Sequence, residues 1–314
     1  MFPLDLLSAG EAFDDLIFSG LSHLPRPGEE LKTDRFERTV GGGALITAIA
    51  ASRLGLRVGV ASALGTPAVD ALEHERIDAV NLRRRHEPAA LSVALSTSRD
   101  RSFVTFNGVN ALLESRLLRA IDDRSARHVH LALAPTRCGA WARLVSRLGR
   151  AGITSSWDFG WNPELRRDPD LSTLVAALDI VFLNESEARL YSGARTDGGA
   201  VTWWRRRARV TVIKRGRHGA LCLTANGTTE APGIRSRAVE TTGAGDAFDA
   251  GFLCGLLDGA PSDACLRLGN AMGSLSTLAA GGIAGLPSRT EGQRLVARLL
   301  GRGARPTRAR RRTG

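Results

Sequence analysis

The chain has 314 residues, of which 43% are hydrophobic and 24% are charged, as in an ordinary globular protein. No apolar stretch approaches the ~20 residues of a membrane helix, and the apolar start lacks a basic leader, so we expect neither a membrane partner nor a signal peptide. Six arginines after residue 301 supply much of the net charge of +11, and residues 301–314 are expected to form a disordered basic tail. Aromatic residues make up only 5%, which disfavours a specific nucleic-acid partner.

The cysteines and histidines show no metal-binding or disulfide pattern. No Cys-x-x-Cys pair occurs, which is typical of reduced thiols in a cytoplasmic protein. His128 and His130 flank Val129 in an apolar run, and we interpret both as structural because the histidines show no His-Glu-x-x-His spacing. The four cysteines are Cys138, Cys222, Cys254 and Cys265.

Short apolar runs alternate with helical patterns along the chain. The expected strands are Leu4–Ala9, Val58–Ala61, His128–Leu133, Ile153–Asp158, Ile180–Leu183 and Val210–Lys214. The expected helices are Ala44–Leu54, Trp141–Arg150, Glu185–Tyr191, Ala244–Leu257 and Ala264–Leu278. Strands that are apolar throughout, with helices between them, predict an α/β fold with a mainly parallel sheet covered on both faces.

Two segments interrupt this alternation. Leu91–Thr97 and Ser102–Phe106 alternate apolar and polar residues around a turn at Ser98–Arg101, the pattern of a half-exposed hairpin. Residues 16–40 also look extended and contain the turn Pro25–Gly28. We therefore expect one domain over residues 1–300, with segments of approximately 12–40 and 88–110 forming a small β-lid.

The segment Glu240–Ala250 (ETTGAGDAFDA) carries the strongest chemical signal. Gly243 and Gly245 let the backbone approach a ligand closely, and the helix that begins there presents free N–H groups and its positive dipole end. We expect Gly243, Ala244 and Gly245 to form an anion hole for a transferring phosphoryl group. Asp246, in the first turn, can accept the proton of an attacking hydroxyl, and the dipole is expected to favour its charged form. The alternative is a glycine-rich helix start with an aspartate that only complements the dipole.

With this segment the chain resembles the ribokinase-like (PfkB-type) carbohydrate kinases over roughly residues 4–290. The resemblance implies a three-layer αβα fold, a β-lid over the sugar, Mg2+ with ATP as phosphate donor, and Asp246 as catalytic base. It also leaves open K+ activation and a homodimer formed through the lid. The other matching motifs are GEAFDDLI (10–17), PGE (27–29), GGG (41–43), GVN (108–110), NESE (184–187) and KRGRHGA (214–220).

The resemblance also implies a nucleotide site. Asn184 and Glu187 have the spacing of a capping box, and in the family this Asn-x-x-Glu pattern organises phosphates and magnesium, with Glu187 acting through water. The two roles are compatible. The other residues expected at the ATP are Lys214, Gly216, Thr242 and Asn270. For Lys214 the alternative is a solvated strand end, and for Asn270 a polar helix position.

The substrate site is expected at the end of the first strand. A carboxylate there can accept hydrogen bonds from two neighbouring hydroxyls, and the resemblance selects Asp15 rather than Asp14. Gly41, Gly42 and Gly43 let the backbone approach the substrate, or else form a plain turn. Asn110 matches an asparagine of the family's lid hinge.

Three positions depart from the family pattern. Ile46 stands where an asparagine usually contacts the sugar, and Glu240 replaces an aspartate that helps to hold a monovalent cation in some members. Asp158–Pro163 (DFGWNP) lacks the usual arginine. We expect an ATP-dependent kinase for a hydroxyl of a sugar or sugar derivative. The alternatives are a nucleoside kinase of the same fold and a non-catalytic sugar or nucleotide sensor.

Overall fold

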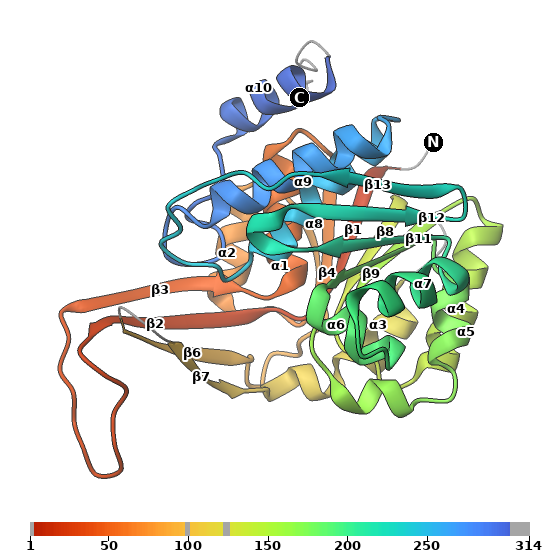
Figure 1. Cartoon of the computed structure of the whole chain (residues 1–314). Coiled ribbons are helices and arrows are strands. Elements are labelled where there is room, and N and C mark those ends of the chain that lie inside the picture. Colours follow the sequence, from red (N-terminus) through yellow and green to blue (C-terminus); the bar gives the residue numbers. More distant parts are fainter. Residues whose placement is uncertain (1–2, 98–100, 122–125, 302–314) are drawn as a thin grey trace, which may run out of the picture.

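The computed structural model describes residues 3–97, 101–121 and 126–301. Most of the expected turn at Ser98–Arg101, and all of the expected disordered tail except Gly301, lie outside these residues. The main sheet has nine strands in the order β13-β12-β11-β10-β9-β8-β1-β4-β5 (Figure 1). Seven of them, from β5 to β11 in this order, are parallel neighbours, and β12 and β13 add an antiparallel edge.

The strands of the main sheet are short and mostly buried, as expected where helices cover both faces. Their bounds are β1 Leu4–Gly10, β4 Val58–Ser62, β5 Asp78–Asn81, β8 Ala126–Ala132, β9 Thr154–Asp158, β10 Ile180–Asn184, β11 Val210–Lys214, β12 Ala220–Thr224 and β13 Gly227–Ala231. The parallel strands place their carboxyl ends at one edge of the sheet, which is where α/β enzymes bind ligands.

Two hydrophobic clusters, one on each face, make the three layers. The first face is covered by α1 (Gly43–Arg53), α2 (Thr66–His74), α8 (Ala244–Leu257), α9 (Ser262–Ser276) and α10 (Arg289–Leu300). The second is covered by α3 (Leu113–Ala120), α4 (Cys138–Arg150), α5 (Leu171–Ala177), α6 (Glu185–Ser192) and α7 (Asp197–Arg207). The expected three-layer αβα architecture is therefore confirmed.

A second, four-stranded sheet forms the lid. Its order is β3-β2-β6-β7, with β2 Phe13–Leu21, β3 Arg35–Gly41, β6 Leu91–Thr97 and β7 Arg101–Phe106. The expected hairpin is the antiparallel β6–β7 pair, and a parallel β2–β6 pairing joins the two lid segments. In Figure 1 the long strands β2 and β3 extend away from the main body.

The expected strands and helices are all present, with ends that differ by at most three residues. The sequence patterns missed helices α2, α3, α5, α7 and α10, the edge strands β5 and β13, and β12 beside β13. β5 is exposed along its whole length and β13 is half polar, so neither carries the apolar run of a buried strand. All four cysteines are buried and none forms a disulfide. Among the described residues, no helix combines the length and apolar character that a membrane crossing requires.

The packing of α8 on α9 depends on a glycine. A Cβ added to Gly251 of α8 would lie 2.7 Å from the carbonyl oxygen of Leu268 and 2.9 Å from the Cα of Gly269, both in α9. Since these are backbone atoms, one helix would have to move. α8 also carries Asp246, so this contact helps to fix the position of the expected base.

We predict that Gly251→Ala lowers the free energy of unfolding by about 1–3 kcal/mol, because overpacking forces the two helices apart. The matched control is Gly149→Ala in α4, where an added Cβ meets no atom within 4 Å. Alanine should stabilise that helix by about 0.5–1 kcal/mol. Urea unfolding of both variants measures the difference, and a Gly251→Ala variant as stable as the parent would contradict the packing argument.

Candidate active site

The candidate site lies at the carboxyl edge of the main sheet. Asp158, Asn184 and Lys214 are the last residues of the adjacent strands β9, β10 and β11. Asp246 reaches the same edge from the start of α8. All four residues line one cavity of about 480 Å3, the inner cavity.

The start of α8 has the geometry that the glycines predict. Gly243 precedes the helix with φ 76°, a left-handed conformation that favours glycine, and no side chain caps the first turn. The N–H of Ala244 donates to the carbonyl of Thr241 at 3.2 Å, so this donor is already engaged. Gly245 and Asp246 line the inner cavity. The open end of the helix therefore lies at Gly245 and Asp246.

Lys214 lies between two carboxylates that sequence analysis did not select. Its Nζ is 2.7 Å from Oδ2 of Asp158 and 3.1 Å from both carboxylate oxygens of Asp249. Asp249 is fully buried in α8, one turn after Asp246, and the same spacing in GDAFDA is the signal that could have revealed it. Oxygens of Asp158, Asp246 and Asp249 all lie within 4.8 Å of one another. The ammonium group of Lys214 thus occupies the position that a metal ion would take in an all-carboxylate cluster.

The charged groups in this cluster shift one another's pKa values. Burial alone disfavours the charged form of Lys214, but Asp158 and Asp249 outweigh it and raise the pKa of the ammonium group. Burial also raises the pKa of Asp158, yet Lys214 reverses the effect and holds that pKa below its usual value. In Asp249 burial dominates, and its pKa is raised well above the usual value. Lys214 is therefore firmly charged and paired chiefly with Asp158.

Asp246 has a raised pKa of about 6, caused first by burial and then by the charge of Asp158, with Lys214 opposing them. The helix dipole was expected to favour the charged form of Asp246 and so to lower its pKa. This expectation was wrong, because the pKa is raised. Removal from water outweighs the dipole, because the carboxylate sits in a closed cluster with two other acids. A carboxylate with a pKa of about 6 is a better proton acceptor near neutral pH than an exposed aspartate.

A second cavity of about 570 Å3, the outer cavity, adjoins the first and shares Lys214, Gly216 and Gly245 with it. Asn270 lines the outer cavity, but its Nδ2 donates to the carbonyl oxygens of Ala231 and Pro232. Its amide donors therefore hold the loop that forms one wall. Of the expected nucleotide residues, Thr242 lines neither cavity, and its N–H donates to Glu240 Oε1 at 3.1 Å.

Asn184 and Glu187 form the expected capping box at the start of α6. The N–H of Glu187 donates to Asn184 Oδ1 at 2.9 Å, and the N–H of Asn184 donates to Glu187 Oε2 at 2.8 Å. Glu187 also lines the inner cavity, and burial, aided by Asp158, raises its pKa. Only Oε2 of the Glu187 carboxylate accepts a hydrogen bond in the capping box. The residue can therefore cap α6 and line the inner cavity at the same time.

The glycines of residues 41–43 lie between the carboxylates of Asp15 and Asp246. A Cβ added to Gly41 would lie 2.0 Å from Asp15 Oδ2, and one added to Gly43 would lie 2.9 Å from Asp246 Oδ1. Gly42 has φ 94°, and its missing side chain leaves room for the backbone of Glu11. Glycine at these positions therefore keeps open the space beside both Asp15 and Asp246.

Asp15 points toward the glycines, whereas Asp14 faces Gly65 on the other side of β2. Burial, together with the nearby charges of Glu240 and Asp14, raises the pKa of Asp15 to about 7. Asn110 donates to the carbonyl of Ala12 at 3.1 Å, and its buried Oδ1 has no partner among the described residues. A substrate hydroxyl could supply that missing donor.

Two departures from the family pattern have structural consequences. Ile46 is 1% exposed. Its Cδ1 fills the space beside Gly243 and Gly282, where a Cβ added to either glycine would lie within 2.8 Å of it. It therefore packs against the backbone just before α8. In the DFGWNP segment, Asp158 binds Lys214, and Trp161 stands 61% exposed at the edge of the inner cavity.

A lidded αβα sheet, with an aspartate at a glycine-rich helix start, defines a ribokinase-like kinase. A family model described as pfkB family carbohydrate kinase matches residues 4–289. The chain therefore belongs to the PfkB family and is an ATP-dependent carbohydrate kinase that phosphorylates a hydroxyl of a sugar or sugar derivative.

Known proteins are similar over most of the chain. A 2-dehydro-3-deoxygluconokinase of Bacillus subtilis is 29% identical over 279 residues, covering 81% of this chain and 85% of that protein. A nucleoside kinase of Methanothermobacter thermautotrophicus is 28% identical over 284 residues, covering 86% of this chain and 88% of that protein. Among solved structures, a probable sugar kinase of Rhizobium etli superposes with a TM-score of 0.81 at 19% identity, covering 95% of this chain and 100% of that one.

The lysine cluster generates a stability prediction. We expect Lys214→Met to lower the free energy of unfolding by about 3–5 kcal/mol at pH 7, because it leaves buried carboxylates without their cation. The loss should shrink as the pH falls toward 4. Down to about pH 4 the change comes from the variant, in which protonation relieves the unpaired acids. The stabilisation that Asp158 gives the parent is lost only below its ordinary pKa of 3.8, because its folded-state pKa is lowered.

Urea unfolding at several pH values measures this difference. The control is Lys32→Met, since Lys32 is the other lysine of the chain and its side chain is 86% exposed. That variant should match the parent within about 0.5 kcal/mol. A Lys214→Met loss that grows on acidification would show that the cluster is not held by this ion pair.

Proposed function

We propose that Asp246 is the catalytic base and that the start of α8 stabilises the transferring phosphoryl group. In the reaction, the substrate hydroxyl oxygen bonds to the γ-phosphorus, the bond from the γ-phosphorus to the ADP oxygen breaks, and the hydroxyl proton passes to the Asp246 carboxylate. The supporting observation is that a carboxylate with a pKa of about 6 stands beside the uncapped helix end and beside Gly43, which leaves its Oδ1 accessible.

The nucleotide site of the proposal spans the two cavities. The outer cavity is lined by apolar groups, including Phe248 and Ile234, and by Asn270, so it suits the adenosine. The phosphates then extend past Gly216, Lys214 and Gly245, which both cavities share. Gly243, Ala244 and Gly245 remain the proposed anion hole, with Thr242 just outside it.

Magnesium fits the inner cavity only beside the lysine cluster. Lys214 already hydrogen-bonds to both Asp158 and Asp249, so we assign the metal to the remaining oxygen of Glu187, through water, with Asn184 beside it. When bound, Mg2+ would neutralise charge on the phosphates. Both carboxylate oxygens of Glu240 accept backbone N–H groups, from Thr242 and Gly281, so its contacts give no support to a K+ site.

For the acceptor we propose a sugar with two neighbouring hydroxyls that differs from ribose and fructose. Asp15 offers both carboxylate oxygens, Asn110 a free carbonyl oxygen, and Gly41–Gly43 an open backbone. Ile46 supplies no hydrogen bond, which favours a substrate with fewer hydroxyls. The names of two kinds of relative, 2-dehydro-3-deoxygluconokinase and 5-dehydro-2-deoxygluconokinase, denote such substrates for those proteins.

A homodimer formed through the lid and a cytoplasmic location complete the proposal. The lid strands β3 and β7 expose Phe36, Phe103 and Phe106 by more than half. Large apolar side chains exposed on both edge strands of the lid sheet are consistent with an interface there. The buried thiols agree with a reducing compartment.

Asp246→Asn should lower kcat by roughly 10²–10⁴ and leave ATP affinity nearly unchanged, because only the proton acceptor is lost. In the parent, kcat/KM for ATP at saturating sugar should fall as the pH drops below about 6, since protonated Asp246 cannot accept the proton. Asp263→Asn, at the exposed start of α9, is the control and should keep full activity. Near-parental turnover by Asp246→Asn would refute the assignment of the base.

Glu187→Gln should raise the magnesium concentration needed for half-maximal rate, while its amide oxygen preserves the cap. Glu187→Ala should in addition cost about 1 kcal/mol of unfolding free energy. The matched control is Glu291, which forms an equivalent capping box with Ser288 in α10. Glu291→Ala should lose similar stability at unchanged magnesium dependence. The same magnesium requirement in Glu187→Gln and parent would leave Glu187 a purely structural role.

Asp15→Ala should abolish detectable sugar phosphorylation without changing ATP affinity, because an acceptor for two substrate hydroxyls is lost. Asp14→Asn, the neighbour that faces Gly65, should retain activity. A panel of sugars, sugar acids and nucleosides, followed by ATP consumption, identifies the acceptor. High parental activity on ribose or fructose that persists in Asp15→Ala would overturn the proposed substrate site.

A further inference from the structure

A third cavity, of about 650 Å3, lies at the opposite edge of the main sheet. It is lined by Thr154, Ile180 and Val210, the first residues of β9, β10 and β11, so we call it the amino-edge cavity. These strands are five residues long and end at the active site, about 13 Å away at 3.3 Å per residue. The amino-edge cavity shares no lining residue with the inner or outer cavity.

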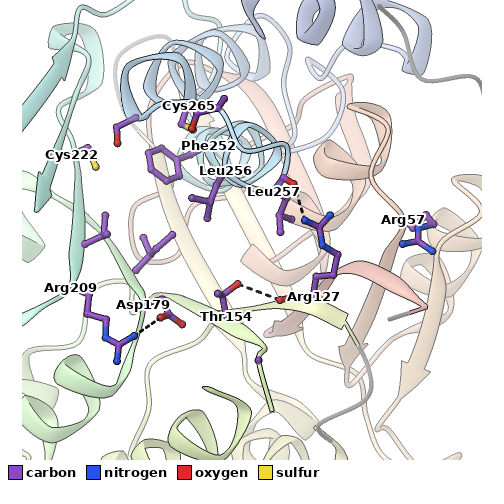
Figure 2. A pocket seen from close by; sticks show the side chains of 15 residues that line it. Arg57, Arg127, Thr154, Asp179, Arg209, Cys222, Phe252, Leu256, Leu257 and Cys265 are labelled. Atoms are coloured by element: carbon purple, nitrogen blue, oxygen red, sulfur yellow. Dashed lines mark hydrogen bonds and ion pairs between the residues drawn. The ribbon is translucent and has the colours of Figure 1, made fainter. Parts of the chain in front are cut away.

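The inner wall of this cavity is apolar. Phe252, Leu256 and Leu257 come from the last two turns of α8, the helix whose first turn carries Asp246 (Figure 2). Phe252 packs edge-on against Phe182 of β10 at 5.5 Å between ring centroids. The volume and the apolar wall suit the body of a small organic molecule rather than a hydrated ion.

The rim of the cavity is basic. Three arginines line it, against one aspartate, Asp179. Figure 2 shows Arg209 beside Asp179 on one side of the opening, and Arg127 and Arg57 on the other. Arg209 is 69% exposed and donates from Nη1 to Asp179 at 3.0 Å, which leaves the rest of its N–H donors for another acceptor. Buried Asp5 pairs with both Arg57 and Arg127, so the three arginines face two carboxylates. The remaining excess of one positive charge favours a ligand with an anionic group.

A hydrogen-bonded chain runs from this cavity through the sheet toward the catalytic cluster. Thr154 Oγ1 lies 2.8 Å from His128 Nδ1, and His128 Nε2 lies 2.7 Å from Ser156 Oγ. Ser156 Oγ in turn lies 2.8 Å from His130 Nδ1. His130 Nε2 is buried and has no hydrogen-bond partner among the described residues, and the charge of Asp158 acts on this ring.

Both histidines are neutral near pH 7, because burial lowers the pKa of His128 to about 3 and that of His130 to about 4. Each ring therefore carries one N–H, and the chain has two self-consistent arrangements. The Thr154 hydroxyl has a distant acceptor outside the chain, the carbonyl oxygen of Arg127 at 3.3 Å, which is long for an O–H···O bond. If the hydroxyl donates to that carbonyl, away from His128, each donor in the chain points toward the cavity and His130 Nε2 is a bare acceptor. If Thr154 donates to His128, the chain reverses and His130 Nε2 carries the proton, so the two arrangements differ in the tautomer of the ring on which the charge of Asp158 acts.

We infer that the amino-edge cavity is a second ligand site, for a small molecule with an apolar body and one anionic group, and that its occupancy alters the catalytic cluster. The apolar body packs on Phe252 and Leu256, and the anionic group binds the arginines. An anionic oxygen that accepts the Thr154 hydroxyl fixes the first arrangement of the chain and removes the proton from His130 Nε2. The coupling to ATP rests on the proposed nucleotide site, whereas the binding itself does not.

The binding test uses 8-anilinonaphthalene-1-sulfonate, an aromatic anion, and its fluorescence on the full chain with saturating ATP, which occupies the nucleotide cavities. Saturable one-site binding is expected. Arg209→Glu and Leu256→Glu should each weaken it by about tenfold or more, through charge reversal and through loss of the apolar wall. The control is Arg167→Glu, since Arg167 is an exposed arginine paired with Glu164 elsewhere on the molecule.

Loss of the fluorescence signal on adding ATP, or equal affinities in the parent and Arg209→Glu, would overturn the site. Arg209→Glu decides the matter if Leu256→Glu fails to fold, because Arg209 is mostly exposed. Weakened binding in Arg209→Glu but not in Arg167→Glu would establish the site without any assay of phosphorylation.

The coupling test measures the Kd for ATP with and without saturating dye. A change of about fivefold or more is expected in the parent, as for an ordinary coupling between two sites. Thr154→Val keeps the shape of the wall but removes the hydroxyl, so the dye should bind and the Kd for ATP should no longer respond. An ATP affinity that the dye leaves unchanged in the parent, or shifts equally in Thr154→Val, would overturn the role of the chain.

Discussion

The ammonium group of Lys214 lies between Asp158 and Asp249 and joins three elements, β9, β11 and α8, at the edge where the chemistry is expected. Burying charges is costly, and removing one partner of a buried pair costs more than the pair contributes. The cluster therefore constrains the ends of both strands and the first turn of α8 together. The position of Asp246, one helical turn from Asp249, follows from that constraint.

The same cluster sets the electrostatics of the proposed base. Burial and the charge of Asp158 raise the pKa of Asp246, but the positive charge of Lys214 opposes them, so the pKa rises only to about 6. A fully unpaired set of three carboxylates would bind a metal ion or hold its protons. With Lys214 among these carboxylates, the proposed metal is assigned to Glu187 instead, and the proposed base can still accept a proton near neutral pH.

Glycines connect this cluster to the lid. The segment Gly41–Gly43 ends the lid strand β3 and begins α1, and it separates Asp15 from Asp246 with backbone alone. Lid position and access to the base are thus linked through a segment without side chains. Toward the opposite edge of the sheet, the buried residues His128, Ser156 and His130 form a hydrogen-bonded chain with the exposed Thr154. The sequence pattern indicates a structural role for these histidines, and the proposed second site would give them a further role.

The sequence by itself determined the alternation of strands and helices, the lid hairpin, the capping box at Asn184 and the motif around Asp246. Each is encoded by neighbours within about ten residues, through apolar periodicity, cap chemistry or glycine conformation. Only the tertiary structure brought Lys214 to Asp158 and Asp249, which are 56 and 35 residues away, and packed Ile46 against Gly243 and Gly282. It also reversed the expected pKa of Asp246, because burial and the charge of a distant strand depend on long-range packing, which no local pattern encodes.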